Sequence, residues 1–100
     1  MRKTVTLCGS LRFFDKIAEL AERLILENGW VVLTPVPHIA HAPLTDDEKQ
    51  ILGEIHRAKI DLSDAIFVVN VNGYIGDAVK SESAYAQNTG KEIFYLEEPQ

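Results

Sequence analysis

The sequence has 100 residues, of which 46% are hydrophobic and 25% are charged, and its formal net charge is −5. This length predicts one domain, residues 1–100, and the composition is typical of a globular protein. The acidic balance argues against a nucleic acid polymer as a partner, because surfaces that bind a phosphate backbone are rich in lysine and arginine.

No apolar run reaches the length of a membrane span, and the first residues lead into a strand pattern rather than a signal peptide. The single cysteine, Cys8, cannot form an internal disulfide, and its place in an apolar strand pattern favours a buried small side chain. We therefore expect a cytoplasmic protein with no membrane partner.

Short apolar runs alternate along the chain with segments of helical periodicity. Thr45 and Glu48 form a capping box that predicts the start of one of these helices. The pattern predicts strands over 4–8, 30–33, 65–71 and 91–96, and helices over about 13–28, 46–63 and 78–89.

This alternation predicts an α/β fold with a four-stranded parallel sheet and helices on both faces. Right-handed crossovers with one reversal of winding favour the strand order 2-1-3-4. Ligands bind such sheets outside the carboxyl ends of the strands, at the point of reversal. Three segments reach that crevice: residues 9–12, the proline-rich loop 34–44, and residues 72–82.

Glu82 follows a glycine-containing turn and lies near the start of the third predicted helix. A carboxylate that points into the crevice could attack an electrophilic sugar carbon. The structural alternative is a glutamate that only complements the helix dipole. The turn itself contributes the candidate binding residues, which are Asn72, Gly73, Gly76 and Asp77.

Gly9, Ser10 and Arg12 follow the first strand, where a hydroxyl, backbone amides and a guanidinium could hold a phosphate. The alternative is a helix cap followed by a solvated arginine. The segment matches neither a P-loop nor a dinucleotide-binding fingerprint, so no cofactor is expected.

The three histidines do not predict a metal. His38 and His41 lie in the proline-rich loop at a spacing that fits no zinc pattern, and there is one cysteine. His56 lies alone on the second predicted helix, where a histidine is usually structural or exposed. No metal site is therefore expected.

Three segments together resemble the nucleoside 2-deoxyribosyltransferase superfamily, which includes the deoxynucleoside 5′-monophosphate N-glycosidases. They are Leu7-Cys8-Gly9-Ser10-Leu11-Arg12, the Ser63-Asp64 pair before the third strand, and the stretch from Gly76 through Glu82 to Ala86, followed by Gly90-Lys91. The turn Tyr74-Ile75-Gly76-Asp77, followed by Lys80-Ser81-Glu82, looks closer still to small, uncharacterised members of the superfamily. The resemblance spans nearly the whole chain in order.

The resemblance implies a flavodoxin-like (Rossmann-like) fold, a homodimer or higher homo-oligomer, and an enzyme that acts on a small nucleoside or nucleotide. It assigns the nucleophile that attacks the anomeric carbon to Glu82, and phosphate binding to Ser10 and Arg12. Two positions depart from the family pattern: Thr6 replaces a tyrosine that steadies the nucleophile, and His56 replaces an aspartate that contacts the substrate. His56 could then act as a proton donor, because imidazole titrates near neutral pH.

Three hypotheses follow. The leading one is cleavage or transfer at the N-glycosidic bond of a (deoxy)nucleoside or its 5′-monophosphate. The second is a non-catalytic nucleotide-binding module, favoured by the two departures. The third is an interaction domain with an exposed apolar helix face, to which Tyr74 and Ile75 could contribute.

Overall fold

Four parallel strands form a single sheet in the computed structural model, which describes residues 1–37 and 42–99. Their order is β2-β1-β3-β4, so the predicted order 2-1-3-4 is confirmed. The strands are β1 Thr4–Cys8, β2 Val31–Leu33, β3 Ala65–Val68 and β4 Glu92–Tyr95.

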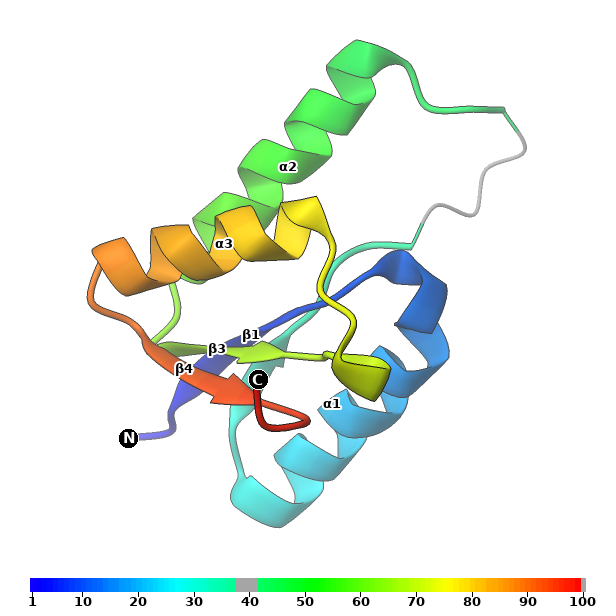
Figure 1. Cartoon of the computed structure of the whole chain (residues 1–100). Helices are drawn as coiled ribbons and strands as arrows, with labels where there is room; N and C mark the ends of the chain where they lie inside the picture. Colours follow the sequence, from blue (N-terminus) through cyan, green and yellow to red (C-terminus); the bar gives the residue numbers. More distant parts are fainter. Residues whose placement is uncertain (38–41, 100) are drawn as a thin grey trace.

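Helices cover both faces of this sheet, which makes the three-layer α/β arrangement of a flavodoxin-like fold. Figure 1 shows α1 below the sheet, and α2 and α3 together above it, with the start of α2 extending away from the strands. The helices are α1 Phe14–Asn28, α2 Asp46–Asp61 and α3 Asp77–Asn88, with short 3₁₀ turns at η1 Leu11–Phe13 and η2 Val71–Gly73. None of the described helices combines the length and apolarity needed to cross a bilayer.

Local sequence signals explain where the longer helices begin and end. The predicted capping box is present, because the Thr45 hydroxyl accepts from the Glu48 amide and the Glu48 carboxylate accepts from the Thr45 amide. At the end of α1, Gly29 adopts a left-handed conformation (φ 67°) and its amide donates to the Ile25 carbonyl.

The third strand is shorter than predicted. It ends at Val68 rather than Val71, because the chain turns into η2, where Asn72 has a φ of 55° that a strand does not allow. The Asn72 amide donates to a Glu97 carboxylate oxygen at 2.6 Å, and the Asn70 side chain pairs with the Glu97 backbone. These hydrogen bonds to Glu97, in the segment after β4, stabilise the turn and prevent the strand from continuing to Val71.

The side chains of the two central strands alternate between two cores. Val5 and Leu7 of β1 pack against α1 in one cluster, whereas Cys8 belongs to a second cluster with residues of α2 and α3. Thr6 is fully buried and bonds to Ser63 and Lys59 at the end of α2. The α2 and α3 face therefore receives the polar side chains of β1.

Candidate active site

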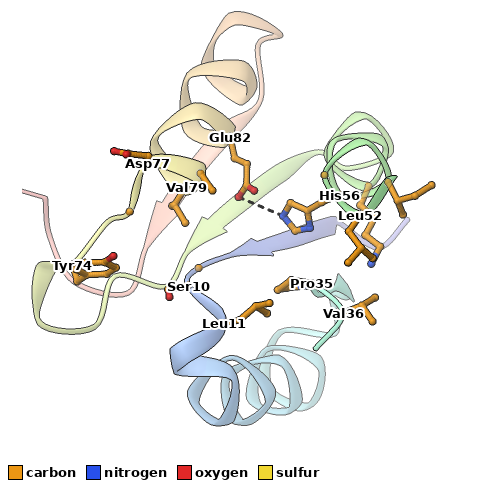
Figure 2. A pocket seen from close by; sticks show the side chains of 16 residues that line it. Ser10, Leu11, Pro35, Val36, Leu52, His56, Tyr74, Asp77, Val79 and Glu82 are labelled. Carbon is orange, nitrogen blue, oxygen red and sulfur yellow. Dashed lines mark ion pairs between the residues drawn. The ribbon is translucent and has the colours of Figure 1, made fainter. Parts of the chain in front are cut away.

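A cavity of about 450 Å³ opens at the carboxyl ends of β1 and β3, between α2 and the start of α3. Figure 2 shows side chains from these elements around it. Its volume lies in the range of small-molecule sites, roughly 300–1,000 Å³. Six of the candidate residues from the sequence line it: Gly9, Ser10, His56, Gly76, Asp77 and Glu82.

The other three candidates lie elsewhere. Asn72 and Gly73 line a second cavity on the side of the turn that faces Glu97 and Lys80, and they are not in the lining of the first. Arg12 lines neither of these two cavities. Its guanidinium carbon lies 4.4 Å from the ring centroid of Tyr74, which does line the first cavity, so the positive charge is held beside the rim.

Glu82 points toward His56, and both side chains face the cavity (Figure 2). Glu82 Oε1 lies 3.5 Å from His56 Nε2, and the same nitrogen lies 3.5 Å from Cys8 Sγ. The side chain of Glu82 is 26% exposed, so the carboxylate is neither sealed in the core nor free in solvent. It can be reached from the cavity.

The helix start does not act on Glu82 as the sequence suggested. Helix α3 begins at Asp77, one residue earlier than predicted, which places Glu82 six residues into the helix and beyond its first turn. Free backbone amides occur only in the first turn, where Asp77 is the acidic residue. The groups nearest to the Glu82 carboxylate are instead the side chains of Cys8 and His56.

Cys8 is fully buried beneath these two side chains. Burial raises the pKa of its thiol well above the ordinary value, and the charge of Glu82 and a hydrogen bond to that carboxylate raise it further. The thiol therefore stays protonated at neutral pH and carries no negative charge toward Glu82.

Gly9 and Ser10 shape the floor of the cavity. A Cβ at Gly9 would lie 3.1 Å from Val69 Cβ and 3.3 Å from Ile17 Cδ1, so glycine permits the close approach of β1 to the end of β3. The Ser10 hydroxyl accepts from the Arg12 amide at 3.3 Å, which is the capping alternative considered from the sequence. Ser10 also faces the cavity, so capping and contact with a ligand are compatible.

Thr6, at the position where the superfamily that this sequence resembles carries a tyrosine, is not in the cavity lining. The Thr6 hydroxyl lies 2.7 Å from the Ser63 hydroxyl and 3.1 Å from the Lys59 carbonyl, and Thr6 is fully buried. Cys8, two residues later on the same face of β1, is the neighbour that Glu82 has instead.

Sequence reasoning missed three features of the site. The apolar pattern around Cys8 predicts a core residue only, although its position immediately before Gly9 at the end of a strand also indicates the edge where ligands bind. Lys59 also lines the cavity, and its Nζ donates to the Thr34 carbonyl at 2.8 Å. The walls are largely apolar, with contributions from the three loops and α2 by Leu11, Pro35, Val36, Leu52 and Tyr74.

One group of possible metal ligands occurs among the described residues. The ligand atoms of Cys8, His56 and Glu82 all lie within 4.8 Å of one another. His38 and His41, the pair considered from the sequence, lie outside the described residues. The expectation of no metal site remains a prediction.

Comparisons with known proteins found no match to this chain, either among protein-family models or among curated proteins.

Proposed function

We propose that the protein cleaves the N-glycosidic bond of a (deoxy)nucleoside or its 5′-monophosphate, with Glu82 as the nucleophile. The observation that carries this proposal is the position of the Glu82 carboxylate, which faces a cavity of suitable size and shares it with Ser10 and His56. The superfamily resemblance supplies the reaction class.

In the proposed reaction, a Glu82 oxygen attacks the anomeric carbon while the bond from that carbon to the base nitrogen breaks. The base leaves with a proton from protonated His56. Water then attacks the same sugar carbon, loses its proton to His56, and releases the free sugar and the Glu82 carboxylate. A second base in place of water would give transfer instead of hydrolysis.

The composition of the walls supports a nucleoside as the ligand. Apolar and aromatic side chains such as Leu52 and Tyr74 suit the face of a base, and Ser10, His56 and Glu82 contribute polar groups to the same lining. The charged groups that line the cavity are two carboxylates, Asp77 and Glu82, against the amine of Lys59. A 5′-phosphate would therefore depend on Arg12 at the rim and on Lys59.

The test is to incubate the protein with a panel of nucleosides and their 5′-monophosphates and to measure free base by chromatography. We expect base release that is lost in Glu82→Gln and retained in Glu54→Gln, a matched change on α2 outside the cavity lining. Arg12→Ala should reduce the rate with a monophosphate more than with its nucleoside. Base release that survives in Glu82→Gln would overturn the proposed role.

The second candidate is a nucleotide-binding module without turnover. It is favoured by the occupation of the Thr6 hydroxyl within the core, which leaves Glu82 without a hydroxyl partner from that position. This candidate predicts thermal stabilisation by a nucleotide without base release, and little effect of Glu82→Gln on that stabilisation.

The proposed homodimer or higher homo-oligomer has support from α2. Ile51, Leu52 and Ile55 lie along this helix and are 56%, 37% and 50% exposed, which leaves an apolar stripe at the edge of the cavity, whose lining includes Leu52 and Ile55. Sedimentation analysis of the wild type and of Ile55→Glu tests the proposal. A monomeric wild type would overturn it.

A further inference from the structure

Cys8, His56 and Glu82 bring a thiol, an imidazole and a carboxylate to one point from three different elements. Cys8 ends β1, His56 lies on the inner side of α2, and Glu82 lies on α3. We propose that these three side chains form a binding site for a divalent transition-metal ion such as Zn²⁺. The inference goes beyond the proposed function and does not depend on it.

The distances between the ligand atoms fit such an ion. With bond lengths of about 2.3 Å to sulfur and 2.0–2.2 Å to nitrogen and oxygen, tetrahedral zinc separates its sulfur and nitrogen ligands by about 3.5 Å and its nitrogen and oxygen ligands by about 3.4 Å. The observed distances are 3.5 Å from Cys8 Sγ to His56 Nε2 and 3.5 Å from His56 Nε2 to Glu82 Oε1. The remaining pair, Cys8 Sγ and the Glu82 carboxylate, lies within 4.8 Å.

These distances are less suited to direct bonding between the side chains. A charge-assisted hydrogen bond between imidazole and carboxylate is normally about 2.7–2.9 Å long. The distance from His56 Nε2 to Glu82 Oε1 is 3.5 Å, which is too long for such a hydrogen bond. A small movement of the partly exposed Glu82 side chain would bring all three atoms to bonding distance of one ion.

The ligand set and its surroundings indicate the class of metal and of site. Thiolate, imidazole and carboxylate are all zinc ligands, and three protein ligands with an open fourth position are typical of reactive rather than structural zinc sites. Here the cavity lies beside the cluster and provides both a route of entry and room for a water in the fourth position.

The surroundings of His56 limit the expected affinity for zinc. His56 Nδ1 is buried and has no hydrogen-bond partner among the described residues. A metal-bound histidine normally donates from its other nitrogen, and loss of that partner weakens binding by roughly 10–100-fold. We therefore expect a site that a chelator empties readily.

Metal binding has a defined proton balance. The ion forms a bond to Cys8 sulfur as the S–H bond breaks, and the released proton passes to the buffer. His56 binds an ion as the neutral imidazole and Glu82 as the carboxylate, so the Cys8 thiol accounts for one proton released per ion, and any His56 that is protonated beforehand adds its own. Because the ion occupies the Glu82 carboxylate, zinc should also inhibit any base release that depends on this residue.

The test uses the purified full chain and metal ions alone. After treatment with a chelator, Zn²⁺ is titrated by calorimetry in buffers of different ionisation enthalpy, and Co²⁺ is titrated by absorption. We expect one saturable site, at least one proton released per ion, and a sulfur-to-cobalt charge-transfer band. Cys8→Ser should remove the band, and both Cys8→Ser and Glu82→Gln should weaken zinc binding by at least about tenfold.

The matched control is Asp77→Asn, which removes a carboxylate from the same cavity lining but not from the cluster, and should leave zinc affinity nearly unchanged. If Cys8→Ser is poorly folded by circular dichroism, Cys8→Ala replaces it. Absence of a saturable site would overturn the proposal. So would binding that persists in the Cys8 and Glu82 variants and is lost when His38 and His41 are replaced. Because no nucleotide is present, these outcomes are separate from those of the base-release assay.

Discussion

The two faces of the sheet differ in what they bury. Under α1, the cluster of buried residues is apolar and includes Val5, Leu7 and Ile17. On the α2 and α3 face, Thr6, Cys8 and His56 are buried beside apolar residues, and the layer opens into the cavity. Adjacent residues of one strand, Leu7 and Cys8, thus serve different layers.

The two faces of the sheet therefore contribute differently to stability. Among the described residues, the buried cluster against α1 consists of apolar side chains, and burial of their apolar surface stabilises the fold. The α2 and α3 face retains polar groups and an open cavity, which lowers its contribution to stability and makes chemistry possible. Variants on each face test this difference.

Leu7→Ala should have the largest effect on stability. Leu7 is fully buried in the α1 core, and removal of its side chain leaves a cavity that costs about 2–5 kcal/mol of the free energy of unfolding. Urea denaturation followed by circular dichroism measures this. A loss below about 1 kcal/mol would mean that the face is less tightly packed than described.

Cys8 should make stability depend on pH in the alkaline range. Because the pKa of the folded thiol is raised, its contribution to stability is fully present below the unfolded pKa of about 8.5 and falls as the pH rises toward the folded pKa. The slope from this group is at most about 1.4 kcal/mol per pH unit. Denaturation of wild type and Cys8→Ala at neutral and alkaline pH, with a reductant, should show a shallower decline in the variant. Identical declines would contradict the burial of a protonated thiol.

Thr6→Val should cost about 1 kcal/mol, less than Leu7→Ala one position away. The variant loses the hydroxyl contacts of Thr6, but the Ser63 hydroxyl still donates to the Lys59 carbonyl at 2.8 Å. Chemical denaturation of the two variants under the same conditions gives the comparison. A larger loss for Thr6→Val would reverse the assignment of stability to the α1 face.

Ile55→Ser should have the smallest effect on the stability of the single chain, within about 0.5 kcal/mol. Ile55 is half exposed on α2, whereas Ile60 on the same helix is fully buried, so Ile60→Ala serves as the matched contrast and should cost about 2–5 kcal/mol. Thermal melts at low protein concentration compare the two. Similar shifts in melting temperature for the two variants would show that Ile55 is covered in solution.

The fold was predictable from the sequence because apolar periodicity, Gly29 and the Thr45 capping box each act locally. The end of β3 was not, because the turn after it depends on bonds from Asn70 and Asn72 to Glu97, far along the chain. The hydrophobic periodicity of a sequence carries no information about hydrogen bonds between residues so far apart in the chain.

The candidate site was predictable in part for the same reason. Topology brings Ser10 and Glu82 to one edge of the sheet, and both line the cavity. The contacts of Glu82 with His56 and Cys8, and of Arg12 with Tyr74, depend on side-chain directions at a helix face and a strand end. Those directions follow only from the packed structure.

Mass spectrometry of the protein mixed rapidly with a nucleoside that it cleaves tests most directly whether Glu82 forms a covalent bond to the sugar. We expect a sugar adduct on the peptide that contains Glu82, and none in Glu82→Gln. An adduct on a different residue, or base release from the wild type with an adduct-free Glu82 throughout turnover, would contradict it.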